Sequence, residues 1–253
     1  MNGAAVDANE ATRNVRLVME YDGADFHGFQ IQPGLRTVQG TIESVLQELL
    51  SEEIRLTGAG RTDEGVHACG QVANFRTSSD MPTHILKRAL NSRLPADIVV
   101  KSADEVSPDF HSRFSAKSRV YRYDICVIRS PIRRRYAWHI KYNLNIGEME
   151  RASDVFIGSH DFTSFCVAKS TVDESSCVVY SSVWRRKADV LQYEIEANRF
   201  LHNMVRVMVG TMVDVGRGRH SMEDIAHILE AKDRRRAGPT APPHGLFLVA
   251  VKY

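Results

Sequence analysis

The sequence predicts an α+β fold made of two related lobes, and three features of its pattern support this prediction. Some segments alternate apolar and polar residues, as half-buried strands do. Others place their apolar residues on one helical face. In the first half the two kinds follow each other in the order β-α-β-β-α-β, which is the order of a ferredoxin-like unit, and the second half repeats it approximately. We therefore expect two ferredoxin-like lobes.

The first lobe is predicted over residues 15–107. It opens with an alternating strand that ends at the turn Asp22-Gly23, and a helix capped by Thr37 follows. The remaining elements are a strand over 70–77, a helix that starts at Pro82 and a strand that starts at Ile98. Residues 105–110 break the periodicity and contain the boundary. Residues 1–14 are small and polar, and we interpret them as a flexible N-terminal leader.

Residues 108–253 form the predicted second lobe. Its expected elements are a strand over 119–128 that continues through 135–141, a helix over 146–157, hairpin strands over 177–186 and 190–197, helices over 202–215 and from Ser221, and a strand over 246–253. The helix over 202–215 is apolar on most sides, which is typical of a buried helix. The residues of this helix that are not apolar recur every four positions, at His202, Arg206, Gly210 and Asp214. One face of the helix should therefore contact polar groups.

Composition excludes several classes of protein. Apolar residues make up 43% of the 253 and charged residues 25%, which excludes collagenous, disordered and disulfide-scaffold chains. The most apolar segment, 204–215, is far shorter than the roughly 20 residues of a membrane span and contains two charges. The four cysteines lie far apart without a C-x-x-C pair, so we expect reduced thiols in a cytoplasmic protein and no zinc site.

Positive charge is concentrated in one part of the chain. Residues 113–141 contain nine Lys and Arg against one acidic residue, whereas residues 1–60 contain four against nine. Such a run suits the neutralisation of RNA phosphates. A solvated face without a partner has the same pattern, and charge alone leaves both open. The candidates for RNA binding are Arg113, Arg133, Arg134 and Arg135.

Residues 58–67 carry the most distinctive local pattern. Three glycines flank Arg61 and Asp63, so the segment should be a shaped loop and not a helix or a packed strand. In an extended stretch residues i and i−2 project to the same side, which would put Arg61 beside Asp63 and hold the carboxylate ionised and oriented. The glycine spacing fits neither a phosphate-binding loop nor a dinucleotide-binding loop. An ordinary surface turn has a similar composition.

Motifs along the chain are more specific than this loop alone. The central one is Gly60-Arg61-Thr62-Asp63 with Gly65-Val66-His67-Ala68. The others include Glu20-Tyr21-Asp22-Gly23, Phe110-His111, Arg113-Phe114-Ser115-Ala116, Tyr121-Arg122-Tyr123, His160-Asp161-Phe162, Met204-Val205-Arg206 and Gly245-Leu246. In their order and spacing the chain resembles the pseudouridine synthase I family, the family of tRNA pseudouridine synthase A, from about Val15 to the C-terminus.

The resemblance implies a pseudouridine synthase fold, with antiparallel sheets flanking a central cleft, and a cofactor-free isomerase. Such an enzyme detaches uracil from C1′ of uridine, turns it and joins its C5 to C1′. In the family pattern Asp63 matches the catalytic aspartate and Arg61 the arginine that pairs with it. Tyr121 matches a tyrosine that packs on uracil, Arg206 an arginine that faces the cleft, and Leu246 part of a strand that lines the pocket. The implied substrate is the anticodon stem-loop of tRNA at positions 38, 39 and 40, bound by a homodimer.

Several alternatives remain open from the residues themselves. An ionised carboxylate can attack C1′ as a nucleophile or remove the C2′ proton as a base. A non-catalytic tRNA-binding or chaperone protein of the same fold would keep the basic face but would have no use for Asp63. A metal-dependent RNA hydrolase is disfavoured because the sequence offers no clustered ligand set. His67 and His202 are interpreted as structural residues.

Overall fold

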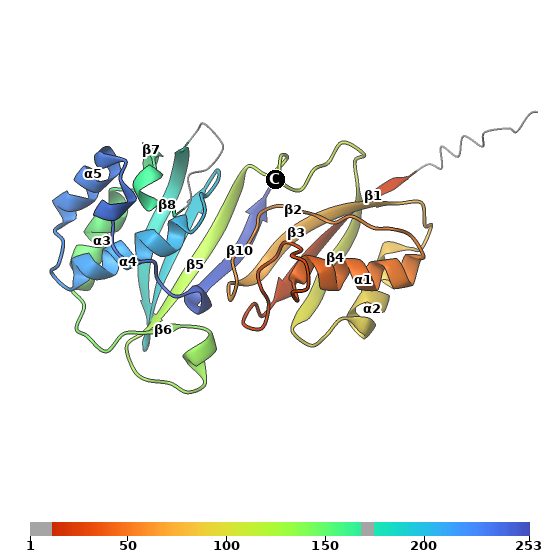
Figure 1. The fold of residues 1–253 in the computed structure, drawn as a ribbon, viewed down its shortest axis with the longest axis horizontal. Helices are drawn as coiled ribbons and strands as arrows, with labels where there is room; N and C mark the ends of the chain where they lie inside the picture. The colour runs from red at the N-terminus through yellow and green to blue at the C-terminus, as the bar shows by residue number, and fades with distance from the viewer. Residues whose placement is uncertain (1–11, 168–174) are drawn as a thin grey trace, which may run out of the picture.

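The structure is a computed structural model that describes residues 12–167 and 175–253. Its helices form two groups at opposite ends of the molecule, and the strands β5 (Ser118–Cys126) and β10 (Leu246–Lys252) run between them (Figure 1). No helix within those two ranges is long and apolar enough to cross a membrane. The mixture of strands and helices confirms the predicted α+β class.

The first half has the predicted order of elements. They are β1 (Arg13–Tyr21), α1 (Val38–Leu50), β2 (Thr57–Gly58), β3 (His67–Thr77), α2 (Thr83–Arg93) and β4 (Ile98–Val106). The strands lie in the order β4-β1-β3-β2, and each neighbouring pair is antiparallel. Thr37 caps α1 as predicted, because its side chain accepts a hydrogen bond from the backbone of Gly40. Alternate residues of β1 are buried, which confirms the period of two.

The predicted leader over residues 1–14 is too long at its C-terminal end. Residues 1–11 lie outside the described residues, but β1 already begins at Arg13. Arg13 pairs with Thr77 of β3, so the backbone hydrogen bonds of the sheet extend to this position. Because residues 13 and 14 have polar side chains, the alternation of apolar and polar residues did not show that they belong to the strand.

The second half adds three helices and the remaining strands. Its elements are β5, β6 (Trp138–His139), α3 (Ile146–Asp154), β7 (Gly158–Asp161), β8 (Ser176–Lys187), β9 (Val190–Ala197), α4 (Met204–Gly216), α5 (Met222–Ala231) and β10, with short 3-10 helices η1 (Arg133–Arg135), η2 (Thr163–Phe165), η3 (Arg234–Arg236) and η4 (Pro243–Gly245). Ser221 and Asp224 form the full capping box of α5. The continuation expected over 135–141 is a strand only at β6, which pairs with β5. The arginines of η1 before it are exposed, whereas Ala137 and Ile140 are buried.

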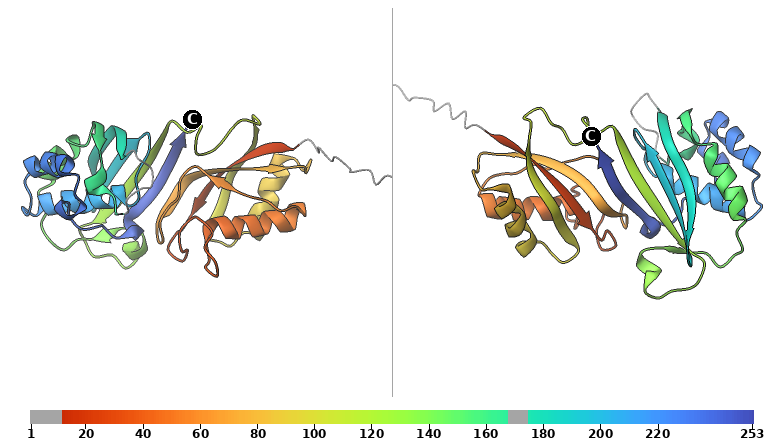
Figure 2. Two further views of the ribbon diagram at one scale, coloured as in Figure 1. Left: turned by 45° about the horizontal axis from the view of Figure 1, so that its top comes forward. Right: turned by 180° about the vertical axis from the view of Figure 1, so that it is seen from behind.

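The prediction of two separate antiparallel sheets is corrected by the strand pairing. The ten strands found in residues 12–167 and 175–253 form one sheet, whose main path is β4-β1-β3-β10-β5-β9-β8-β7. The last strand of the chain, β10, lies between the two halves and next to β5, as both views of Figure 2 show. It pairs in parallel with β3 and antiparallel with β5, where Leu248 faces Tyr121. Through β10 the start of β3, directly after the Asp63 loop, comes next to the core of the second half.

The buried helix α4 confirms the prediction of one polar face. Gly210 has no room for a side chain, because a Cβ there would lie 1.7 Å from the carbonyl oxygen of Pro239. The segment after η3 therefore passes directly over the helix, and the backbone of Ala241 donates a hydrogen bond to the carbonyl oxygen of Arg206. At the far end of the face Asp214 pairs with Arg219 at 3.4 Å. This close packing fixes the first turn of α4 against its neighbours.

Candidate active site

The loop that carries Asp63 connects β2 to β3 and is anchored on both sides. The hydroxyls of Thr62 and Tyr21 lie 2.7 Å apart and share a buried hydrogen bond. The amide of Gln71 donates to the carbonyl oxygen of Gly60 at 2.9 Å, and the backbone of Phe29 donates to that of Thr62 at 3.0 Å. Gly65 has φ of +74°, a value that favours glycine, and lets the chain turn directly after Asp63. These hydrogen bonds and the turn at Gly65 therefore fix the conformation of the loop.

Two side chains at the N-terminal end of α4 contact the carboxylate of Asp63. Nη1 of Arg206 lies 3.3 Å from Oδ2 of Asp63, and Nε2 of His202 lies 3.4 Å from Oδ1. The Asp63 side chain is 27% exposed, so a substrate can reach it, whereas Arg206 is only 15% exposed. Nε of Arg206 donates to the carbonyl oxygen of Ala241 at 2.8 Å, and the side chain of Asn203 accepts a further hydrogen bond from Nη1. A guanidinium held in this way fixes the direction of the carboxylate.

The predicted pairing of Arg61 with Asp63 is not what the structure shows. The side chain of Arg61 is exposed and makes no hydrogen bond or ion pair within the described ranges. The prediction assumed a locally extended backbone, but Thr62 is anchored inward and the chain turns at Asp63, where the backbone of Val66 donates to the carbonyl oxygen of Asp63. The carboxylate consequently faces α4.

His202 was interpreted as structural, but it lies beside the candidate carboxylate, a position that the sequence did not predict. Its side chain is 52% exposed and contacts the carboxylate of Asp63. Asn203, with φ of +61°, lies directly before α4 and supports Arg206. Sequence reasoning missed Asn203 altogether. The available signal for His202 was its position four residues before Arg206, on the same polar face of the helix.

A cleft of about 660 Å³ opens in front of Asp63. Residues from both halves of the chain line it: Ala24, Asp25, Asp63, Glu64, Gly65, Arg134, Arg135, His202, Asn203, Arg206, Pro243 and His244. The basic run thus brings Arg134 and Arg135 to the cleft, whereas Arg133 and Arg113 do not line it. Within the parts of the chain that the structure describes, no three His, Cys, Asp or Glu side chains cluster in a way that could hold a metal ion.

Tyr121 and Leu246 lie in the sheet beneath this cleft and do not line it. Tyr121, on β5, is 9% exposed, and its ring meets the edge of Phe200 at 5.0 Å between centroids. Burial raises the pKa of the Tyr121 phenol, and the nearby acidic groups of Tyr21 and Asp63 raise it further, so the hydroxyl stays neutral. Leu246 opens β10 and is buried opposite Tyr123.

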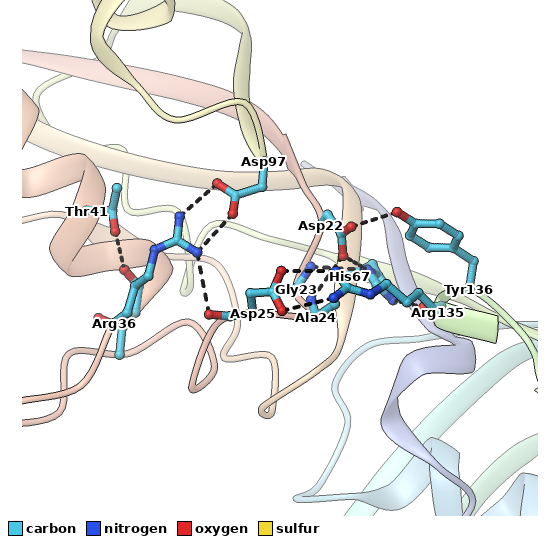
Figure 3. A network of polar contacts seen from close by, with 11 residues as sticks. Asp22, Gly23, Ala24, Asp25, Arg36, Thr41, His67, Asp97, Arg135 and Tyr136 are labelled. Atoms are coloured by element: carbon cyan, nitrogen blue, oxygen red, sulfur yellow. Dashed lines mark hydrogen bonds and ion pairs between the residues drawn. The ribbon is translucent and has the colours of Figure 1, made fainter. Parts of the chain in front are cut away.

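A polar network connects Arg135 and Tyr136, at the end of the basic run, to the loop after β1 (Figure 3). The hydroxyl of Tyr136 donates to Asp22 at 2.7 Å, and Arg135 forms an ion pair with Asp25 at 3.0 Å. His67 lies at its centre, with Nε2 at 2.9 Å from the carbonyl oxygen of Arg135. These contacts hold η1 beside the cleft.

Burial of His67 in this network favours the neutral ring. Nδ1 accepts a hydrogen bond from the backbone of Gly23 at 3.1 Å and also lies 3.0 Å from Oδ1 of Asp22, and Nε2 lies against the carbonyl oxygen of Arg135. Burial lowers the pKa of His67, and it outweighs the nearby carboxylate of Asp22, which raises it. The ring also stacks on Phe247 of β10 at 4.8 Å between centroids. His67 thus makes packing contacts and hydrogen bonds, and its structural role stays a prediction.

Comparison with known proteins gives a consistent result. A family model described as tRNA pseudouridine synthase matches residues 17–115 and 152–253. A Geobacillus protein (strain WCH70) is 45% identical over 245 residues, which cover 96% of this chain and 99% of the relative. A Thermoanaerobacter protein (strain X514) is 46% identical over 243 residues, covering 95% and 100%. A Halalkalibacterium halodurans protein is 46% identical over 238 residues, covering 93% and 90%. All three relatives are named tRNA pseudouridine synthase A.

Proposed function

The chain belongs to the tRNA pseudouridine synthase family, and from this premise we propose that Asp63 attacks the ribose of the target uridine. The protein is an isomerase that converts uridine to pseudouridine in tRNA. In this reaction the N1–C1′ bond breaks, a C5–C1′ bond forms, and the proton on C5 is lost. The protein must therefore hold the sugar and the detached base next to one reactive group.

The observation that carries this proposal is the carboxylate of Asp63 in the cleft, held from behind by Arg206. Attack at C1′ and removal of the C2′ proton both need an ionised carboxylate with a fixed direction. Arg206 supplies that direction from α4, and His202 contacts the second carboxylate oxygen. A protein that only bound tRNA would need the cations of the cleft but not this arrangement.

We assign the surrounding residues to substrate binding. On the family resemblance we assign Tyr121 to contact with the uracil ring and Leu246 to the same part of the pocket, although neither lines the cleft. Arg61, whose guanidinium is free to reach solvent, contacts the RNA strand at the edge of the loop. A base in a helix must leave its stack before Asp63 can reach its sugar, so cations are needed on the flanking phosphates. Arg134 and Arg135 at the cleft are suitable for this purpose, with Arg133 and Arg113 farther out.

The substrate region is proposed to be the anticodon stem-loop, at positions 38, 39 and 40 of tRNA. We further propose two lobes, 15–107 and 108–253, one on each side of the cleft, since the cleft takes its lining residues from both ranges. The acidic character of residues 1–60 favours a homodimer, in which tRNA is bound largely by basic surfaces of both copies. The cytoplasm is the proposed location, because the cysteine spacing fits reduced thiols.

Release of hydrogen from C5 tests the proposal. The protein is incubated with tRNA that carries tritium at uridine C5, without metal or nucleotide, and release of tritium to water is followed. We expect release with the wild type, none with Asp63→Asn, and unchanged tRNA binding in that variant. Asp25→Asn is the matched control, since Asp25 lines the same cleft but pairs with Arg135. Tritium release by Asp63→Asn would contradict the proposed role of Asp63.

The same assay separates the two chemical routes. Deuterium at C2′ gives a large, primary isotope effect only if Asp63 removes that proton in a step that limits the rate. A wild type that binds tRNA tightly but releases no tritium would instead favour the non-catalytic alternative.

A further inference from the structure

The loop between β4 and β5, residues 107–117, carries an aromatic ring that the protein does not cover. Phe114 is 76% exposed. It does not line the cleft in front of Asp63. A single exposed apolar side chain is common on protein surfaces, so the groups around Phe114 decide whether it is a binding site.

Phe114 sits in a preformed turn. Its ring lies against that of His111, with centroids 4.4 Å apart and planes inclined by 37°. Nδ1 of His111 accepts hydrogen bonds from the backbones of Arg113 and Phe114, at 3.2 and 3.3 Å. The backbones of His111 and Ser115 close the turn, because Ser115 donates to the carbonyl oxygen of His111 at 2.9 Å. A ligand would therefore meet a ring whose position is already set.

Buried contacts anchor this turn to the sheet. Ser112 is fully buried; its backbone donates to the side chain of Asn74 at 2.9 Å, and its hydroxyl donates to the carbonyl oxygen of Thr57. The hydroxyl of Tyr253 donates to the carbonyl oxygen of Ser112 at 2.8 Å. The turn is thereby attached to β3, to β2 and to the end of β10.

Arg119 connects the turn to the catalytic loop. Its guanidinium donates to the carbonyl oxygens of Arg113 at 2.7 Å, Ala59 at 3.0 Å and Asn198 at 2.9 Å. Ala59 lies in the loop of Asp63, four residues before it. Arg119 thus acts as a structural brace, although its sequence position placed it in the basic run. A group bound on Phe114 would have a fixed position relative to Asp63.

Charge around the ring favours a nucleic acid over an apolar peptide. The guanidinium of Arg113 lies 5.5 Å from the centre of the Phe114 ring. Neither Arg113 nor Lys117 takes part in an ion pair within residues 12–167 and 175–253, and both are exposed. A cavity of about 540 Å³ beside His111 is lined by Arg55 and Arg76 but also by Glu53 and Asp109, so it is a poor place for a phosphate. Arg113 and Lys117, by contrast, lie one and three positions from Phe114 in the chain.

We propose that Phe114, with Arg113 and His111, is a stacking platform for an unpaired nucleotide of the tRNA, outside the catalytic cleft. The base lies on the open face of the Phe114 ring, and its phosphate is neutralised by Arg113 and Lys117. Every nucleobase has an aromatic face, so the platform recognises an unstacked base without selecting its identity. Because Arg119 braces the platform against the catalytic loop, it helps to set which uridine reaches Asp63. This inference rests on tRNA being the substrate.

Three substitutions at one position test the platform. Phe114→Ala removes the ring, Phe114→Leu keeps an apolar side chain without an aromatic face, and Phe114→Trp restores a face. Tyr180→Ala is the control, since Tyr180 is an exposed aromatic residue on β8. Binding of tRNA to the full-length protein is measured by titration, and the oligomeric state of each variant by sedimentation. We expect Kd about tenfold higher for Ala and for Leu, and wild-type Kd for Trp and for the Tyr180 control.

Each other outcome overturns the inference. Wild-type affinity in Phe114→Ala would show that no base stacks there, and wild-type affinity in Phe114→Leu would show a merely apolar contact. A change of oligomeric state in Phe114→Ala would identify the ring as part of an interface between copies of this chain. The readout is binding and not catalysis. A wild type that releases no tritium therefore counts against the proposed function, while the order of the three Kd values still tests the platform.

Discussion

Arg206→Gln is the substitution whose effect the structure predicts in most detail. The guanidinium of Arg206 connects the carboxylate of Asp63 with the backbone of Ala241 and with Asn203. Glutamine is neutral and too short to serve these partners together. The carboxylate would keep only the contact with His202, which is half exposed.

The size of the effect follows from two contributions. A hydrogen bond to a charged group contributes about 1.5–3 kcal/mol, and partial exposure of Asp63 favours the lower value, which corresponds to about a tenfold loss of rate. A carboxylate that loses its direction can cost roughly a further hundredfold, because reacting groups must be aligned to within about 1 Å. We therefore expect the chemical step to slow by between about 10-fold and 1000-fold. Stability should fall by only about 1 kcal/mol, the contribution of the hydrogen bond to Ala241.

Single-turnover release of tritium from C5-labelled tRNA isolates this step. Arg206→Lys keeps the charge, but a point charge cannot contact both Asp63 and Ala241, so we expect an intermediate rate. Arg219→Gln is the control, because Arg219 pairs with Asp214 at the opposite end of α4. A rate within about threefold of the wild type in Arg206→Gln, with tRNA saturating, would refute the argument that Arg206 orients the carboxylate.

Three other predictions test the network, the basic segment and the packing of α4. Burial lowers the pKa of His67, so folding favours the neutral ring; stability should be full above the ordinary histidine pKa of about 6.5 and fall as pH drops below it. Urea unfolding between pH 7.5 and 5 should show a smaller loss in His67→Gln than in the wild type, and equal losses would contradict this account. Arg134→Gln should lower the slope of log Kd against log salt by about 1, and an unchanged slope would leave Arg134 as a solvated residue. Gly210→Ala should destabilise the protein by more than about 2 kcal/mol in the same unfolding assay, because the new Cβ would overlap the carbonyl oxygen of Pro239. Gly147→Ala in α3 meets only an ordinary contact at 3.6 Å and should be tolerated; similar losses in the two alanine variants would be inconsistent with a steric cause.

Local patterns in the sequence predicted the elements of the fold and the central residue of the site. Thr37 and Ser221 cap helices where expected, and alternation located β1, β8 and β9 to within a few residues. These features depend on residues a few positions apart, which sequence reasoning can read directly. Asp63 was identified through its motif and the family resemblance, because the glycine-rich loop alone was compatible with an ordinary turn.

The tertiary structure decided which distant residues meet. Arg61, two positions from Asp63, was the expected partner, but Arg206, 143 positions away, takes that place. His202 reaches the same carboxylate, and β10 joins two halves that were expected to have separate sheets. Strand pairing and helix packing bring these groups together, and neither leaves a local signal at the residues concerned. The sequence by itself therefore determined the elements and the candidate carboxylate, whereas the residues that contact Asp63 were determined by the packing of α4 and β10 against its loop.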